Sequence, residues 1–210
     1  MRKILAFTLA ETLIVMGIIG IVSALTLPNL NSSTGEKEKV AKIMKLYRDL
    51  NDAHGRVSAV YGPIDEWIRD AHGNSDDEKL FERVTEFLKV SKSDVNNLTA
   101  ILADGTELKI SANKCVDNSS HYGSKFCGYL ITDIDGPNKG KNKLGVDIFR
   151  FDLLLDGVYP DGMDSSTGKN ACVMVNNEPY SCTRWIVENG NMDYLKCNDK
   201  LKWGQQISCK

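Results

Sequence analysis

One carboxylate lies within the most apolar part of the sequence. Glu11 is the only ionisable side chain between residues 7 and 27. As a helix this segment would be roughly 30 Å long, which matches the hydrocarbon core of a bilayer. A carboxylate in such a helix costs about 3 kcal/mol, and such residues usually have a functional partner. If the chain were cut after Ala6, the new amine of Phe7 would lie one helical turn from Glu11 and could neutralise it. Alternatively, Glu11 extends to the cytoplasmic interface.

The residues before the apolar segment indicate its orientation. Arg2 and Lys3 precede it directly. Basic residues favour the cytoplasmic side of a membrane helix. We therefore expect a single-pass membrane protein with the N-terminus in the cytoplasm and the rest of the chain exported.

The order of residues in this segment resembles the prepilin cleavage and methylation motif of type IV pilins and type II secretion pseudopilins. That family has a short basic leader, a small residue at the cut, Phe next, Glu as the fifth mature residue, and often a glycine and a proline in the membrane helix. The matching residues here are Arg2, Lys3, Ala6, Phe7, Glu11, Gly20 and Pro28. The family usually has Gly before the cut, where this chain has Ala6.

The resemblance implies a processing and assembly route. Prepilin peptidase would cut between Ala6 and Phe7, and Phe7 would be N-methylated. Glu11 would then act in assembly with other pilin or pseudopilin subunits, in contact with inner-membrane lipid. The implied function is that of a structural subunit of a type IV pilus or a secretion pseudopilus. The implied location is the bacterial inner membrane, with the head in the periplasm, or a cell-surface filament.

An ordinary signal peptide is the alternative interpretation. Val22-Ser23-Ala24 resembles a small-x-small cleavage site, after which the mature chain would begin at Leu25. The product would be an exported or membrane-anchored monomeric binding protein for a carbohydrate or a protein. Glu11 argues against it, because a carboxylate weakens the apolar region of a signal peptide.

The cysteines indicate disulfides in an oxidising compartment. All lie in the C-terminal half, at Cys115, Cys127, Cys172, Cys182, Cys197 and Cys209. An even number behind an apolar N-terminus favours disulfides, and the lack of a C-x-x-C pair disfavours zinc. A hairpin turning at Asn176-Asn177 would join Cys172 to Cys182, and the next-nearest pairs are Cys115 with Cys127 and Cys197 with Cys209. A crossed pattern, such as Cys182 with Cys197, is the rival.

A group of aspartates is the only candidate metal site. Asp133 and Asp135 flank a bend that continues through Gly136-Pro137-Asn138, and Asp147 follows. Alternating carboxylates can bind Ca²⁺, but the third carboxylate of an EF-hand-like loop is missing. The same residues are typical of a turn in which Asp and Asn bond the local backbone. The turn is the favoured interpretation, with no other cofactor expected.

Periodicity predicts an α+β fold. Pro28 should kink or end the first helix, and Ser33-Thr34-Gly35-Glu36 should cap a second, amphipathic helix that ends at Tyr61. A short helix should begin at 75–78. Strands are expected at 99–102, 107–110, 129–134, 147–155, 171–175 and 183–187. The expected organisation is a leader at 1–6, a transmembrane and polymerisation helix at 7–30, a helix continuing into the head at 31–60, and an antiparallel sheet head with disulfides at 61–210.

Composition and motifs limit the remaining functions. Hydrophobic residues make up 42% and charged residues 26% of 210 residues, which is typical of a globular chain. The net charge of −2 indicates no general nucleic-acid surface. The sequence has none of the common hydrolase, metalloprotease or nucleotide-binding motifs, and its histidines are scattered. We therefore expect a protein that is not an enzyme.

Overall fold

The computed structural model describes residues 9–69, 73–117, 123–162, 172, 174–175, 178–179 and 182–210, without the side chains at 23–34, 174–175 and 178–179. The chain divides into two compact units, Met1–Glu38 and Lys39–Lys210. We call the second the head unit. All buried core residues in the described part of the chain belong to it, so the head unit contains its own hydrophobic core.

The first helix is longer than the sequence predicts. Helix α1 extends from Leu9 to Tyr61 without a break. Of the two outcomes predicted at Pro28, a kink or an end of the helix, the end is therefore wrong, and so is the prediction that a new helix begins at Ser33. A proline removes one backbone donor, but its fixed φ is that of an α-helix, so helical geometry can continue on both sides. A helix that is already formed has paired N–H groups at Ser33, which leaves no free N–H groups for a cap to satisfy.

The head part of α1 is amphipathic, as predicted. Its buried residues recur every three or four positions and are Ile43, Leu46, Leu50, Ala53 and Val57. The helix ends at Tyr61 because Gly62 adopts a φ of 82°, a left-handed conformation that glycine tolerates. The N–H of Gly62 bonds the carbonyl oxygen of Ser58 at 3.1 Å and closes the last turn.

Two further helices follow α1. Helix α2 spans Ile64–Trp67 and helix α3 spans Asp77–Glu86. Asp76 caps α3 by accepting a hydrogen bond from the N–H of Lys79 at 2.9 Å. The buried side of α3 consists of Leu80, Phe81 and Val84.

The head unit contains a six-stranded antiparallel sheet in the order β1-β2-β3-β4-β5-β6. The strands are β1 Val90–Asp94, β2 Thr99–Leu102, β3 Glu107–Asp117, β4 Lys125–Asp133, β5 Ile148–Leu154 and β6 Gly157–Pro160. The strands predicted at 99–102 and 107–110 correspond to β2 and to the first part of β3, and the turn at Asp104-Gly105 joins them. The predicted strands at 129–134 and 147–155 correspond to β4 and β5. The two edge strands, β1 and β6, were not predicted.

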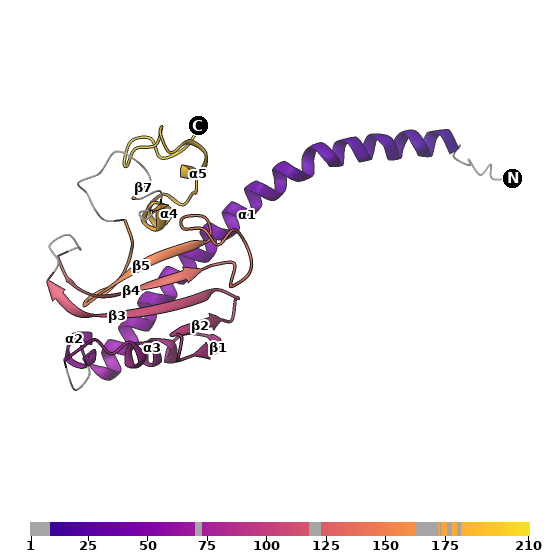
Figure 1. The fold of residues 1–210 in the computed structure, drawn as a ribbon. Helices are drawn as coiled ribbons and strands as arrows, with labels where there is room; N and C mark the ends of the chain where they lie inside the picture. Colours follow the sequence, from indigo (N-terminus) through magenta and orange to yellow (C-terminus); the bar gives the residue numbers. More distant parts are fainter. Residues whose placement is uncertain are drawn as a thin grey trace. The chain divides into compact units, whose positions relative to one another are not determined.

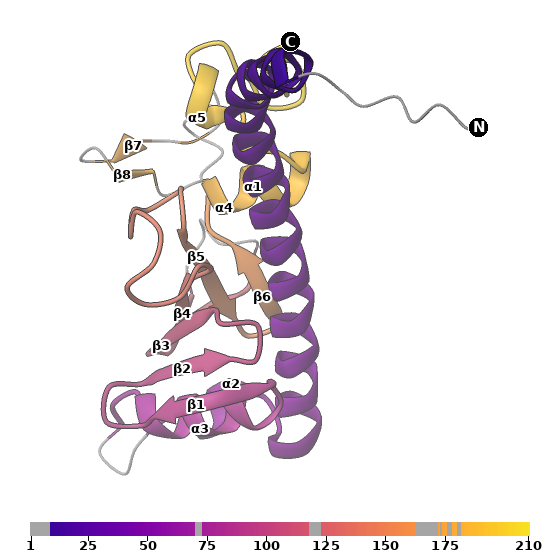
Figure 2. The ribbon, with the colours of Figure 1, turned by 90° about the vertical axis from the view of Figure 1, so that its right-hand side faces the viewer.

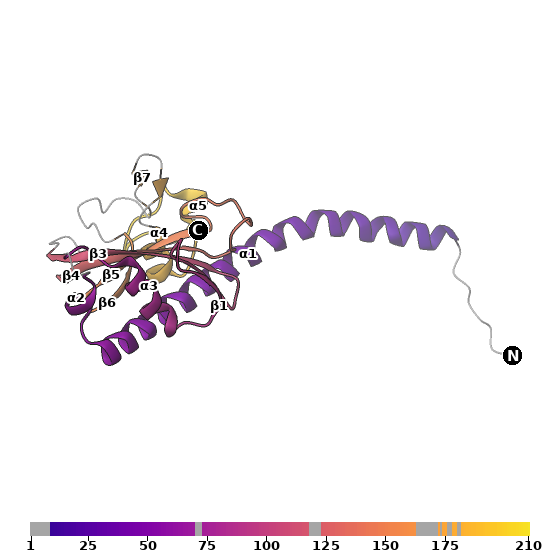
Figure 3. The same cartoon turned by 60° about the horizontal axis from the view of Figure 1, so that its bottom comes forward.

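One face of the sheet forms the core. Its central buried side chains are Leu108, Ile110, Leu130, Phe149 and Phe151. In the head unit, α1 and α3 cover this face (Figures 1 and 3). Tyr47 of α1 stacks on Phe151 with ring centroids 6.1 Å apart. The structure therefore confirms an α+β head with an antiparallel sheet.

The C-terminal part differs from the prediction. Of the strand expected at 171–175, the described residues form a strand only at Met174–Val175. Residues 183–187 are not a strand, because helix α4 spans Cys182–Asn189. The β-branched and aromatic residues favour a strand, but the buried positions are Cys182, Thr183, Trp185 and Ile186, which share one helical face. Helix α4 packs against β5 and β6 (Figure 2).

Three disulfides connect the cysteines in sequential order. They are Cys115–Cys127, Cys172–Cys182 and Cys197–Cys209, so the crossed pattern is not formed. Between Cys172 and Cys182, β7 Met174–Val175 pairs with β8 Glu178–Pro179. Cys182 begins α4 and is not a strand residue, so this disulfide joins a residue that precedes the hairpin to the start of a helix. The last disulfide joins α5, Tyr194–Cys197, to the C-terminal segment.

Candidate functional site

The N-terminal part of α1 presents an apolar surface. Its exposed large side chains are Leu9, Leu13, Ile14, Val15, Met16, Ile18, Ile19, Ile21 and Val22. Exposed apolar surfaces of this kind mark contacts with a membrane or with another protein. Glu11 lies in the first turn of the helix and is also exposed.

The predicted processing site and membrane span are only partly described. Ala6 and Phe7 lie outside the described residues, as do the side chains at the end of the span expected at 7–27. Within the described residues, no helix combines the length and apolarity needed to cross a bilayer.

The predicted calcium loop is organised by hydrogen bonds to its own backbone. Oδ1 of Asp133 accepts hydrogen bonds from the N–H groups of Asp135 and Gly136, both at 3.1 Å. The carboxylate of Asp147 accepts from the N–H groups of Lys141, Asn142 and Lys143. This is the turn geometry that the sequence favoured.

The remaining carboxylate of this loop pairs with α1. Asp135 Oδ2 lies 2.8 Å from Lys39 Nζ, which also donates to the carbonyl oxygen of Val146 at 3.2 Å. Burial raises the pKa of Asp133, and the nearby carboxylates of Asp147 and Asp135 also raise it, while the hydrogen bonds from two N–H groups oppose the shift. Among the described residues, no group of three potential ligands is arranged to hold a metal ion.

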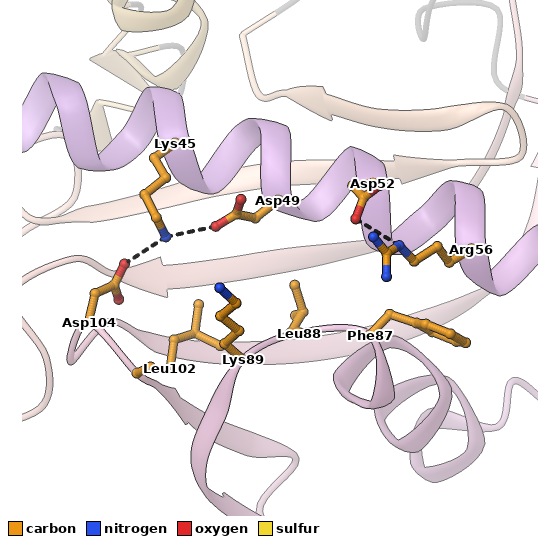
Figure 4. A pocket seen from close by; sticks show the side chains of 10 residues that line it. Lys45, Asp49, Asp52, Arg56, Phe87, Leu88, Lys89, Leu102 and Asp104 are labelled. Atoms are coloured by element: carbon orange, nitrogen blue, oxygen red, sulfur yellow. Dashed lines mark hydrogen bonds and ion pairs between the residues drawn. The ribbon is translucent and has the colours of Figure 1, made fainter.

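A groove lies between α1 and the β1–β2 side of the sheet (Figure 4). Its volume is about 440 Å³. One wall is a charged stripe on α1, and the other is formed by the segment after α3 and the β2–β3 turn. The lining residues are Lys45, Asp49, Asp52, Arg56, Phe87, Leu88, Lys89, Leu102, Ala103 and Asp104.

The charges of the groove are largely paired with one another. Lys45 Nζ lies 2.8 Å from Asp49 Oδ2 and 3.3 Å from Asp104 Oδ2. The hydrogen bond to Asp49 makes the largest contribution to the raised pKa of Lys45. Arg56 Nε lies 2.9 Å from Asp52 Oδ2. The groove therefore has an apolar part and a rim of balanced charge, without a cluster of like charges that would select an ionic ligand.

Two carboxylates, those of Asp152 and Asp161, lie close to Arg150 on the face of the sheet opposite the core. Arg150 bonds Asp152 Oδ1 through Nη2 at 3.1 Å, whereas its Nε lies 3.8 Å from Asp161 Oδ2. Burial raises the pKa of Asp161 to about 7, and the charge of Asp152 raises it too, while Arg150 and the N–H of Gly162 oppose the shift. The sequence does not predict this site, because Asp161 approaches Arg150 and Asp152 only when β6 pairs with β5.

The histidines do not form a site in the described residues. His54 is 7% exposed on α1, and burial lowers the pKa of its imidazole. His72 and His121 lie outside the described residues.

Comparison with protein-family models, with curated proteins and with solved structures finds no match to this chain. A functional assignment therefore depends on the residues themselves.

Proposed function

We propose that this chain is a prepilin-type structural subunit of a type IV pilus or a type II secretion pseudopilus. The observation that carries the proposal is the position of Glu11, which lies four residues after Phe7 in an otherwise apolar segment. Several residue types at fixed spacings must coincide to produce this resemblance. An isolated carboxylate would only weaken an anchor or a signal peptide.

The architecture supports the same proposal. The apolar side chains from Leu9 to Val22 are exposed, so the chain itself leaves them available for lipid or for other subunits. The same helix, α1, then contributes the buried residues from Ile43 to Val57 to the head unit. One continuous element thus combines an assembly surface with an anchor for the head.

The proposed location follows from this arrangement. The N-terminal helix would cross the inner membrane once, with Arg2 and Lys3 on the cytoplasmic side. The head, with its three disulfides, would fold in the oxidising periplasm. The proposed partners are prepilin peptidase, other pilin or pseudopilin subunits, and inner-membrane lipid.

A single experiment tests this function. Filaments are sheared from cells that express the chain, and the N-terminus of the mature protein is determined by mass spectrometry. We expect the chain in the filaments to begin at N-methylated Phe7. A soluble monomer that begins at Leu25 would instead establish the exported binding protein, for which the groove in Figure 4 is the candidate ligand site.

A further inference from the structure

The loop that joins β4 to β5 carries a concentrated positive charge. We call residues 135–147 the basic loop. Its lysines, Lys139, Lys141 and Lys143, are all exposed. The structure shows no ion pair for these three side chains within the described residues. The whole chain has a net charge of −2, so this positive surface is local.

The acidic residues of the basic loop do not neutralise its outer surface. The carboxylate of Asp147 accepts hydrogen bonds from the backbone N–H groups of all three residues from Lys141 to Lys143. Asp135 forms an ion pair with Lys39 of α1. Asp147 is fully buried, whereas the three lysines are exposed. The fold thus separates the charges of one short segment into a buried acidic side and an exposed basic side.

The basic loop lies where α1 enters the head unit (Figure 1). Lys39 is the first residue of that unit, and it contacts both Asp135 and the carbonyl oxygen of Val146. One turn later, Lys42 Nζ donates to the carbonyl oxygen of Ile134 at 3.4 Å. The loop is therefore fixed to the first turns of the helix within the head.

Chain length keeps this end of the head close to any bilayer that holds the apolar segment. The apolar segment ends at Leu27. At 1.5 Å per residue, at most roughly 18 Å of helix separates Leu27 from Lys39. The headgroup layer on one side of a bilayer occupies about 5–7 Å of that distance. The remainder is at most about 11–13 Å, between one and two Debye lengths of about 8 Å at physiological salt, so the headgroup charges are attenuated at the loop but still reach it.

We propose that the basic loop contacts the anionic lipid headgroups of the membrane that holds α1. This inference rests on the proposed function, which places the N-terminal helix in a bilayer. Clustered lysines are attracted to a negative membrane surface as point charges, and this attraction requires no directional contact. A nucleic acid is a less suitable partner, because the loop from Asp135 to Asp147 contains no aromatic residue on which a base could stack.

The first test measures the reactivity of lysines in the full chain. The protein is inserted into nanodiscs of phosphatidylcholine alone or of phosphatidylcholine mixed with anionic phosphatidylglycerol. Amine acylation is then followed by mass spectrometry. We expect phosphatidylglycerol to slow the labelling of Lys139, Lys141 and Lys143 by about three-fold or more, and 1 M NaCl, where the Debye length is about 3 Å, to abolish the difference. Lys92, Lys109 and Lys114, which are exposed on β1 and β3, serve as internal controls and should label equally in both lipids.

The second test compares two matched variants. One replaces Lys139, Lys141 and Lys143 with Gln, and the other replaces Lys92, Lys109 and Lys114 with Gln. Each changes the net charge from −2 to −5, because three positive charges are removed. Energy transfer from the three tryptophans to a dansyl-labelled lipid reports how closely the head approaches the membrane. We expect phosphatidylglycerol to increase this transfer in the natural chain and in the strand variant, but not in the loop variant.

The outcomes separate this proposal from the proposed function. Insertion into nanodiscs with equal labelling of the loop lysines in both lipids would refute the lipid contact and leave the anchor intact. A chain that does not insert would contradict the anchor. In that case, phosphatidylglycerol vesicles are added to the protein. If they slow the acylation of the three loop lysines in a salt-sensitive way, the contact with anionic lipid is still supported. If they do not, the contact is refuted. Protection of the loop by duplex DNA, with none by phosphatidylglycerol, would identify a nucleic-acid surface and overturn the proposal.

Discussion

The side-chain amide of Asn51 forms two hydrogen bonds with the backbone of Val158. Nδ2 donates to the carbonyl oxygen at 3.0 Å, and Oδ1 accepts from the N–H at 3.1 Å. Asn51 belongs to α1, and Val158 belongs to the edge strand β6. The amide therefore satisfies backbone groups that a further strand would otherwise pair, and it connects the helix to the edge of the sheet.

Replacing this amide should destabilise the head unit. Asn51→Ala leaves the N–H and the carbonyl group of Val158 without these partners, so we expect the free energy of unfolding to fall by about 1–3 kcal/mol. Urea denaturation of the full chain in detergent, followed by near-ultraviolet circular dichroism, measures the change. Asn97→Ala is the matched control, because Asn97 bonds Asp94 on an exposed turn. Equal effects of the two substitutions would show that the bonds to Val158 contribute little.

The stability of the head should depend on the protonation of Asp161. Its pKa is about 7 in the folded chain, against an ordinary value of 3.8, because burial disfavours the carboxylate. The folded state therefore binds more protons than the unfolded state between these values. The contribution of Asp161 is complete below about pH 4 and is lost as the pH rises to about 7. The lost contribution is at most a few kcal/mol, since one pKa unit corresponds to about 1.4 kcal/mol.

The Asp161→Asn variant isolates this effect from other titrating groups. His54 acts in the opposite direction, because burial lowers its pKa and makes the folded state less stable below about pH 6.5. We therefore compare the natural chain with Asp161→Asn in urea denaturation at several values between about pH 5 and pH 8. The free energy of unfolding of the natural chain should fall relative to the variant as the pH rises. Parallel curves would mean that Asp161 titrates normally.

Calcium should not stabilise the head through the aspartates at 133, 135 and 147. The carboxylates of Asp133 and Asp147 accept backbone hydrogen bonds, and Asp135 pairs with Lys39. A cation would have to displace these contacts. We expect the same melting temperature in EGTA and in millimolar Ca²⁺. A ligand that binds only the folded state raises the melting temperature, so an increase that Asp133→Asn abolishes would establish a calcium site.

Loss of the last disulfide should affect mainly the C-terminal segment. Cys197 and Cys209 close a loop with a sequence separation of 12, for which the chain-entropy model gives about 3 kcal/mol. In the Cys197→Ser/Cys209→Ser variant we expect faster amide hydrogen exchange at residues 191–209, with little change in β3 and β4. The Cys115→Ser/Cys127→Ser variant is the comparison, because that disulfide joins β3 to β4 and its loss should increase exchange in the sheet. If amide exchange in the first variant became faster to the same degree throughout the head, the disulfide would not have a local role.

Glu11 should be required for assembly but not for insertion. Under the proposed function, its carboxylate pairs with the Phe7 amine of a neighbouring subunit, because a carboxylate at that depth of an apolar helix is costly. We expect Glu11→Ala to insert and to be cleaved normally, and to be lost from sheared filaments by about ten-fold or more, since a pair of this kind is worth more than 1.4 kcal/mol. Glu11→Gln tests whether the charge is needed. Normal assembly of both variants would remove the proposed role.

Much of the fold could be predicted because it depends on local periodicity. The buried positions of α1 from Ile43 to Val57, the cap at Asp76 and the turn at Asp104-Gly105 all follow from residues that are close in sequence. The sequential disulfides were also predicted, because each closes a short loop. Local sequence patterns predicted the wrong secondary structure in two places. The helix continues through Pro28, and Trp185 lies on a helix although its neighbours favour a strand.

Sequence alone determined the apolar N-terminal segment with its single carboxylate at Glu11, because hydropathy and spacing are properties of the chain itself. Only the tertiary structure decided which charges are neutralised. Lys39 pairs with Asp135, and Asp161 lies beside Asp152, across separations in sequence that no periodic pattern encodes. The tertiary structure also leaves the charges of Lys139, Lys141 and Lys143 exposed. Folding turns the neighbouring carboxylate of Asp147 onto the backbone, where burial and hydrogen bonds hold it away from the surface.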